Sequence, residues 1–265
     1  SFSCDTNDWT QMNNLIDLTG KNALVTGGSR GVGRATALML ARAGAGVGIA
    51  YRSRAEEAAG VVEELRALGV HAWAQAGDLS SPDAANALFE RAQEEFDGLD
   101  LFVGNHGIWP PVDVPVSEMT DEQWHSTIGA NLHSVFYTCR AAARVLRDHG
   151  RVVLVGSTAG QRGESFHADY ASTKGAMISF VKGFCLELAP RGITVNCVAP
   201  GWIDTEMSES AYRGEERDRV AAAIPIGRIA TADDVAGPIV FLCSELGRHL
   251  TGEIMNVNGG AVLVG

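Results

Sequence analysis

TGGSRGVG, residues 26–33, follows directly on the apolar run NALVT (22–26) and leads into a helical pattern. A turn with so few side chains lets backbone N–H groups approach a phosphate, and parallel α/β sheets bind ligands where such a strand passes into a helix. Glycine also serves any tight strand-to-helix connection, but the spacing TGxxxGxG, in place of GxGxxG, is more informative. The turn is predicted to bind a dinucleotide through Gly27, Ser29, Arg30, Gly31, Val32 and Gly33.

Short apolar runs alternate with longer helical patterns along the chain. Segments such as RVVLVG (151–156) contain continuous apolar runs, as expected of strands covered on both faces, whereas HAWAQA (71–76) is a weaker candidate. One helical segment begins with Ser81 as N-cap and Pro82 at the first helical position. The alternation predicts an α/β fold, a doubly wound, Rossmann-like parallel sheet with helices on both faces. About seven strands are expected, at 22–26, 46–50, 71–76, 99–104, 151–156, 193–199 and 253–258.

Composition limits the class of protein. A chain of 265 residues, 46% hydrophobic and 20% charged, suits one domain with a large core. The net charge of -11 disfavours nucleic acid and anionic membranes as partners, because both bind clustered lysine and arginine. The five cysteines are scattered and never in CxxC spacing, which indicates neither a disulfide framework nor a metal site. With no signal-peptide or membrane-span pattern, we expect a cytoplasmic protein.

The N-terminal residues stand outside the strand–helix pattern. Residues 18–265 are expected to form the single domain, and residues 1–17 an N-terminal arm that is polar apart from Phe2, Trp9 and a few others. The arm is either a loose tail or, with these two aromatic anchors, a segment docked on its own subunit or a neighbour.

Six motifs together carry a family resemblance. In order, they are TGGSRGVG, GNHG (104–107), Asn131, Ser157, YASTK (170–174) and PGWIDT (200–205). From about Leu18 to its C-terminus the chain resembles the short-chain dehydrogenase/reductase family in its single-domain form. It is similar to the 3-oxoacyl-carrier-protein reductases and related carbonyl reductases of that family. The family's habit implies a homotetramer.

Carbonyl reduction requires an acid and a second hydrogen-bond donor, and residues of these motifs can supply both. Hydride transfer to a carbonyl leaves an alkoxide that needs a proton, so we predict Tyr170 as the acid. Lys174 lies four residues on, on the same helical face, where its charge can lower the phenol pKa from about 10. The resemblance further implies that Lys174 holds the nicotinamide ribose, that Ser157 donates to the substrate oxygen and that Asn131 supports a water chain. The predicted catalytic residues are Asn131, Ser157, Tyr170 and Lys174.

The second strand indicates which dinucleotide is bound. NAD-binding sheets place an acidic residue at its end, about twenty residues past the glycines, but this chain reads AYRSR (50–54) with Tyr51 there. We predict NADP(H), with its 2′-phosphate held by Arg30 and Arg52 and the Ser29 and Ser53 hydroxyls. The alternative is that these arginines are solvated surface charges. The resemblance adds Asp78, Leu79, Asn105, Gly107, Tyr170, Lys174, Pro200, Gly201, Ile203 and Thr205 to the cofactor site.

The substrate region departs from the family pattern at one histidine. His106 stands in GNHG where the family usually has alanine, and we expect it to hydrogen-bond nearby backbone rather than to titrate in the pocket. Residues 202–224 correspond to the family's variable lid, and Trp109, Trp202, Met207 and Tyr212 suggest an apolar guest, ring-shaped or acyl. His167 either reads a polar substrate group or starts a helix. The predicted substrate residues are Ser157, Trp109, His167, Trp202 and Met207.

These observations favour an NADPH-dependent oxidoreductase that transfers a hydride to a small ketone or aldehyde, with a 3-oxoacyl thioester as one candidate. The alternative enzyme is an NAD(P)-dependent dehydrogenase of a sugar or secondary alcohol, because the same groups serve either direction. A non-catalytic dinucleotide-sensing protein is the third hypothesis, and the intact serine, tyrosine and lysine count against it. Substrate identity and stereochemistry stay open.

Overall fold

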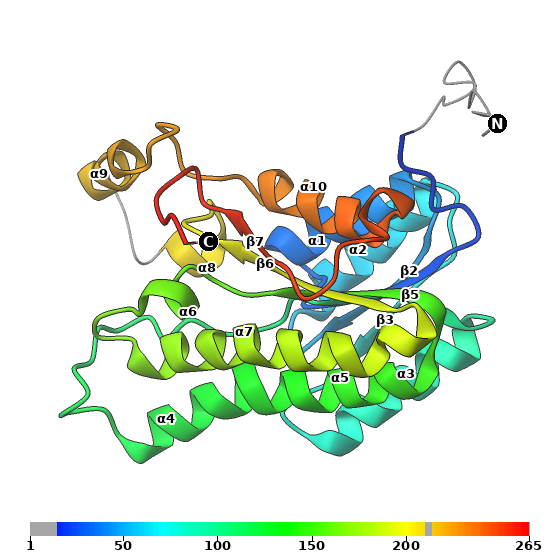
Figure 1. The fold of residues 1–265 in the computed structure, drawn as a ribbon, viewed down its shortest axis with the longest axis horizontal. Helices are drawn as coiled ribbons and strands as arrows, with labels where there is room; N and C mark the ends of the chain where they lie inside the picture. Colours follow the sequence, from blue (N-terminus) through cyan, green and yellow to red (C-terminus); the bar gives the residue numbers. More distant parts are fainter. Residues whose placement is uncertain (1–14, 210–213, 265) are drawn as a thin grey trace, which may run out of the picture.

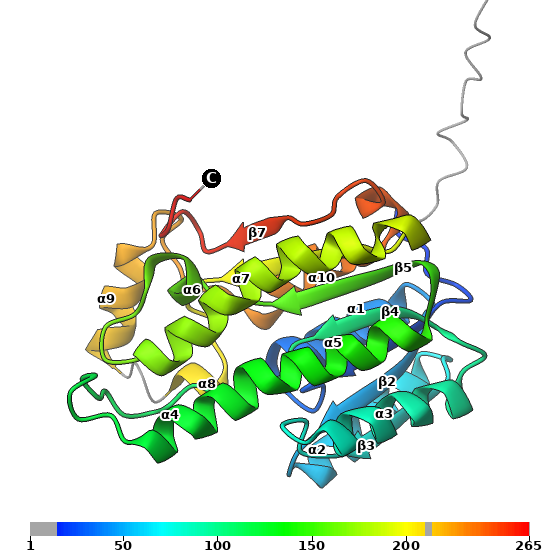
Figure 2. The same cartoon turned by 60° about the horizontal axis from the view of Figure 1, so that its bottom comes forward.

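The computed structural model describes residues 15–209 and 214–264, and within them seven parallel strands form one sheet in the order β3-β2-β1-β4-β5-β6-β7 (Figure 1). Figure 2 shows the strand arrows pointing toward the side that carries α8 and α9. The predicted doubly wound sheet is confirmed, including the weak candidate at 71–76. The strands are β1 (Asn22–Thr26), β2 (Gly46–Tyr51), β3 (Ala72–Ala76), β4 (Leu99–Gly104), β5 (Leu146–Val155), β6 (Thr194–Pro200) and β7 (Ile254–Val257).

The winding of the sheet reverses at β1. Val25 of β1 pairs with Ile49 of β2 on one side and with Val103 of β4 on the other. The crevice that binds ligands in such sheets lies beyond the carboxyl ends of the strands at this reversal. The glycine turn that follows β1 therefore stands at the edge of the crevice.

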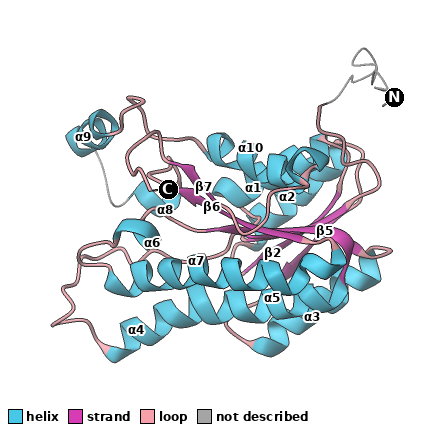
Figure 3. Cartoon of the chain, in the orientation of Figure 1, coloured by secondary structure: helices cyan, strands magenta, loops and turns pink. Residues whose placement is uncertain are grey.

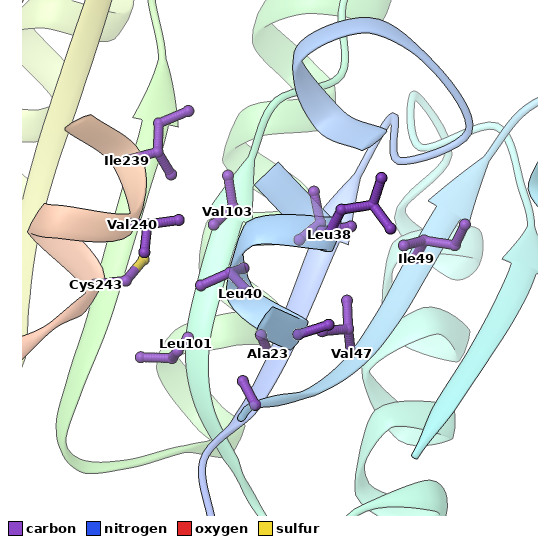
Figure 4. Close-up of a cluster of buried hydrophobic side chains, with 14 of the residues drawn as sticks. Ala23, Leu38, Leu40, Val47, Ile49, Leu101, Val103, Ile239, Val240 and Cys243 are labelled. Carbon is purple, nitrogen blue, oxygen red and sulfur yellow. The ribbon is translucent and has the colours of Figure 1, made fainter. Parts of the chain in front are cut away.

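Helices cover both faces of the sheet (Figures 1 and 3). Side chains of β1, β2 and β4 form one buried core with α1, α2 and α10, of which Figure 4 shows Leu40, Val47 and Leu101. The opposite face of the sheet packs on α3, α5 and α7. These helices are α1 (Gly31–Arg42), α2 (Ala55–Ala67), α3 (Pro82–Glu95), α5 (Ser134–Val145), α7 (Ala168–Leu188) and α10 (Ala232–Cys243).

Local signals set several element boundaries. The Ser81 side chain accepts a hydrogen bond from the backbone N–H of Ala84 at the start of α3, as predicted. β5 begins before the predicted residue 151, because Leu146 already pairs with Leu99 ahead of a register shift. The remaining elements are α4 (Asp121–Ile128), the π-helix η2 (Gly129–His133), α6 (Ala159–Arg162), η3 (Ala189–Arg191), α8 (Glu206–Glu209), α9 (Glu215–Ala223) and η4 (Glu245–Gly247).

Three expectations concern the chain as a whole. In the part that the structure describes, no helix has the length and apolar character needed to cross a membrane. Cys139, Cys185, Cys197 and Cys243 are free and buried, while Cys4 lies outside the described residues. Phe2 and Trp9 lie outside them too, so the division into an arm (1–17) and a domain (18–265) stays a prediction.

Candidate active site

The glycine turn is fixed by its own close packing and by the end of β4. Gly27 has a φ of +65°, and a Cβ on Gly33 would lie 2.1 Å from the Gly27 carbonyl oxygen. Asn105 Nδ2 donates to the carbonyl oxygens of Thr26 (3.1 Å) and Gly27 (3.2 Å). Side chains at Gly27 and Gly33 are therefore excluded, and the turn keeps a backbone surface against which a pyrophosphate can fit.

A cavity of about 560 Å³ opens at the carboxyl ends of the strands, beside this turn. All the predicted cofactor residues line this cavity except Gly33, which packs against the turn instead. Ser157 lines it too, so predicted cofactor residues and predicted catalytic residues border the same cavity. The predicted residues in its wall are Gly27, Ser29, Arg30, Gly31, Val32, Tyr51, Arg52, Ser53, Asp78, Leu79, Asn105, Gly107, Ser157, Tyr170, Lys174, Pro200, Gly201, Ile203 and Thr205.

The catalytic candidates come from the end of β5 and the first turns of α7. Ser157 follows β5, and Tyr170 and Lys174 lie one helical turn apart on α7. The Lys174 ammonium is 5.7 Å from the centroid of the Tyr170 ring and donates to the Val155 carbonyl oxygen at 2.7 Å. The three side chains therefore meet in the cavity, as the sequence predicted.

The electrostatics of this group differ from the expectation. Burial raises the pKa of Tyr170 to about 12, although a hydrogen bond from Ser157 acts to lower it. Burial also lowers the pKa of Lys174 to about 8. The predicted net lowering of the phenol pKa is wrong for this structure, because desolvation by burial outweighs the effects that favour the phenolate, and the Lys174 ammonium donates to the Val155 carbonyl oxygen. Tyr170 is thus a protonated donor at neutral pH.

Asn131 holds the loop after β4. It lies buried in the π-helix η2, an element that often marks functional sites. Its Oδ1 accepts from the Ile108 N–H at 2.7 Å, and its Nδ2 donates to the Ile108 carbonyl at 2.9 Å. The amide therefore pairs with the backbone N–H and carbonyl of the loop at Ile108, and so positions a residue of the cavity wall. Its place in a water chain stays a prediction.

Asp169 is a residue of this site that the sequence reasoning missed. Its buried carboxylate accepts from Thr127 Oγ1 (2.8 Å), Gln123 Nε2 (3.2 Å) and the backbone N–H of Tyr170 (2.8 Å). It joins α4 to the first turn of α7 and so fixes the start of the helix that carries the acid. Its place next to Tyr170 was the only signal in the sequence.

Replacing Asp169 with alanine is expected to destabilise the fold. The change leaves the Thr127 hydroxyl and the Gln123 amide without their acceptor, and about 2 to 4 kcal/mol of unfolding free energy should be lost. Urea unfolding followed by circular dichroism measures the loss. Asp113→Ala, a change at an exposed carboxylate, is the control, and equal midpoints for the two variants would contradict the structural role of Asp169.

His106 borders the cavity as a neutral ring. Its Nδ1 is 2.7 Å from Thr26 Oγ1, so the predicted hydrogen bond to backbone is wrong and the partner is a side-chain hydroxyl. Burial lowers the pKa of His106 to about 4. Its buried Nε2 has no hydrogen-bond partner among the residues that the structure describes. His106 therefore does not titrate near neutral pH.

Aromatic rings gather beside Tyr170. Trp109 contacts the Tyr170 ring edge-on, with centroids 4.7 Å apart, and Trp202 lies 6.3 Å from Trp109. Trp109 also stacks on His167 at 4.0 Å. Neither Trp109 nor Trp202 is among the residues that line the cavity of about 560 Å³, so the two rings extend its apolar surroundings next to Tyr170, and the predicted apolar guest stays a prediction. The side chain of Met207 and all of Tyr212 lie outside the described residues.

His167 lies buried between the loop at Pro110 and the start of α7. Its Nε2 lies 3.0 Å from the Pro110 carbonyl oxygen and its Nδ1 3.4 Å from that of Ser165. The Nε2 also lies 3.8 Å from the exposed Asp113 carboxylate, and the His167 side chain makes no hydrogen bond that caps α7, although His167 is its N-cap residue. His167 therefore stands at the start of α7, as one of the two predicted roles has it, and its buried imidazole ties the loop at Pro110 to that start. A contact with the substrate stays a prediction.

The adenosine end of the cavity is rich in charge. Asp78 accepts from the Ser80 hydroxyl at 2.7 Å, and this bond and one from the Ser80 backbone lower its pKa. Arg52 borders the cavity as predicted, and Arg54 joins it. Glu206, at the start of α8, lies 2.5 Å from Arg30 and 3.2 Å from Arg54. Sequence reasoning missed the roles of Arg54 and Glu206, although AYRSR already contained the former.

No cluster of histidine, cysteine, aspartate or glutamate suited to a metal occurs within residues 15–209 and 214–264.

Comparisons with known proteins agree with this geometry. A family model described as Enoyl-(Acyl carrier protein) reductase matches residues 27–262. The chain is 38% identical over 251 residues to the 3-oxoacyl-[acyl-carrier-protein] reductase FabG of Escherichia coli K12, covering 94% of this chain and all of the relative. It is 37% identical to the L-rhamnose 1-dehydrogenase (NAD(P)(+)) of Azotobacter vinelandii over 253 residues, 93% of this chain and 97% of the relative.

One solved structure relates the fold to a cofactor complex. A short-chain dehydrogenase from Burkholderia cenocepacia J2315, solved in complex with NADP, is 38% identical and superposes with a TM-score of 0.87. The alignment covers 92% of this chain and 98% of the other.

Proposed function

Because the chain belongs to the short-chain dehydrogenase/reductase family, we propose that it is an NADPH-dependent ketoreductase with Tyr170 as its acid. The observation that carries the proposal is the shared cavity. Ser157, Tyr170 and Lys174 border the same space as the glycine turn, so a hydride donor bound on the turn meets a proton donor. A non-catalytic sensor would not need this set intact.

The residues present fit NADP(H). The close approach at Gly27 and Gly33 admits a pyrophosphate, and Arg30, Arg52 and Arg54 border the end of the cavity where the adenosine phosphate would lie. A structural relative was solved with NADP, which supports the same cofactor here. When bound, NADPH supplies a hydride to the carbonyl carbon. The proposed cofactor residues are those predicted from the sequence, with Arg54 added.

The side chains around the substrate then bind the carbonyl oxygen, donate the proton and stabilise the charge that is left. The Ser157 hydroxyl donates to the carbonyl oxygen, and Tyr170 gives its phenolic proton to that oxygen as the alkoxide forms. Lys174 places a positive charge close to the phenol and stabilises the phenolate that is left. Trp109, in edge contact with Tyr170, and Trp202 beside it offer apolar surface next to the reacting carbonyl.

For the substrate, we propose a 3-oxoacyl thioester, as the name of the Escherichia coli relative suggests. A second candidate is oxidation of a sugar, because the rhamnose dehydrogenase is nearly as similar. Initial rates with acetoacetyl thioester and NADPH, set against L-rhamnose with NAD⁺ or NADP⁺, distinguish the two. A higher kcat/KM for the sugar would overturn the reductase proposal.

Assembly and compartment are part of the proposal. The family's habit implies a homotetramer, and the exposed side chains of Phe136 on α5 and Leu186 on α7 give it apolar surface. Free, buried cysteines suit the reducing cytoplasm.

The pH dependence follows from Lys174. Its charged form is needed beside the phenol, and burial lowers the pKa of its ammonium to about 8. We expect kcat/KM for NADPH, which reports the free enzyme, to be level below pH 8 and to fall above it, by about tenfold per pH unit. Because the pKa of His106 is lowered to about 4, no inflection should appear near 6.5. A rate that rises through pH 9 would contradict this assignment.

A further inference from the structure

Two arginines from different turns converge on one carboxylate at the adenosine end of the cavity. Arg30 Nη1 lies 2.5 Å and Arg54 Nη2 3.2 Å from the same oxygen, Oε2 of Glu206. Arg30 belongs to the turn after β1, Arg54 precedes α2 and Glu206 opens α8, and all three border the cavity. A carboxylate oxygen thus lies between two guanidinium groups, where an oxygen of a bound phosphate would be expected.

On the proposed function, on which this inference rests, the anion for these arginines is the 2′-phosphate of NADP(H). A carboxylate and a phosphate cannot both lie between the two arginines, because like charges at contact distance repel. NADP(H) must therefore displace Glu206 from Arg30 and Arg54. NAD(H) has a ribose hydroxyl at this position, which leaves the carboxylate in place and can donate a hydrogen bond to it.

We infer that Glu206 is a specificity-determining residue, which competes with the 2′-phosphate and so reduces the preference for NADP(H) over NAD(H). The competition is moderate, because the Arg30, Arg54 and Glu206 side chains are 40%, 42% and 57% exposed and solvent screens the attraction between them. Arg52 makes no hydrogen bond or ion pair with any residue in 15–209 or 214–264, which leaves it for the phosphate. Glu206 therefore sets the degree of preference rather than its direction.

The chain offers a matched control for this inference. Glu57 on α2 also pairs with Arg54, at 2.8 Å between Arg54 Nη1 and Glu57 Oε1. Its side chain is exposed to a similar degree, but Glu57 does not border the cavity. Glu57→Gln and Glu206→Gln remove the same charge from the same arginine, and only the second removes an occupant of the phosphate position.

The test is the ratio of dissociation constants, Kd for NADH over Kd for NADPH, measured by cofactor fluorescence at low ionic strength with the full chain. Glu206→Gln should tighten NADPH binding about threefold to tenfold, leave NADH unchanged or weaker, and raise the ratio accordingly. Glu57→Gln should change the ratio by less than about twofold. Melting curves show whether each variant is folded.

Two results would overturn the inference: an unchanged ratio in Glu206→Gln, or an equal rise in Glu57→Gln, which would assign the effect to net charge. Failure of the proposed function is read separately, from the parent. A parent that binds NADH as tightly as NADPH and reduces no carbonyl contradicts the ketoreductase, whereas the change of ratio in Glu206→Gln still decides the role of Glu206.

Discussion

Replacing Tyr170 with phenylalanine is expected to lower the turnover number at least about a hundredfold, with the affinity for NADPH nearly unchanged. The change removes the phenolic oxygen that gives its proton to the alkoxide. The ring itself stays, so its edge contact with Trp109 at 4.7 Å is kept and the cavity wall is not disturbed. Single-turnover rates and a fluorescence titration with NADPH measure the two quantities separately.

Tyr137→Phe is the control for this substitution, because it removes a hydroxyl from a tyrosine on α5 that is not in the cavity wall. Its activity should match the parent. If Tyr170→Phe kept a turnover within threefold of the parent, the proton would have to come from another group and the proposed mechanism would be wrong.

Replacing Tyr51 with aspartate together with Arg52 with alanine is expected to reverse the choice of cofactor. The parent should prefer NADPH about a hundredfold or more, because two charge-assisted contacts to the 2′-phosphate contribute roughly 1.5 kcal/mol each or more. The new carboxylate at 51 accepts the ribose hydroxyls of NADH and repels the phosphate of NADPH. Dissociation constants of both reduced cofactors at low ionic strength measure the reversal.

Salt provides the control for this second prediction. In the parent, the preference for NADPH should shrink as ionic strength rises, because the arginines are partly exposed and screening weakens their contacts. The preference of the double variant for NADH, which depends on hydrogen bonds to ribose, should be less sensitive. A parent that binds NADH and NADPH equally would leave Arg30 and Arg52 without the assigned role.

Those parts of the site that follow from local spacing could be predicted from the sequence. Tyr170 and Lys174 are four residues apart on one helix, and the glycine turn follows its strand directly. Most strands contain a continuous apolar run because helices cover both faces of the sheet, and these runs identified the strands before the topology was known.

The rest depends on contacts between distant segments. Glu206 meets Arg30 across 176 residues, and the Asp169 carboxylate is held by Thr127 and Gln123 from another helix. No periodicity in the sequence indicates such pairs. The pKa of the Tyr170 phenol was misjudged for a related reason, because the sequence shows a neighbouring charge but does not show the depth of burial that outweighs it.

Carbonyl-dependent oxidation of reduced cofactor by the full chain tests the central claim most directly. With acetoacetyl thioester as substrate, the parent should oxidise NADPH in step with the thioester added, and much faster than NADH at equal concentration. Tyr170→Phe should bind NADPH and oxidise almost none of it. Consumption of NADPH that does not depend on the carbonyl compound, or an equal rate with NADH, would contradict an NADPH-dependent ketoreductase.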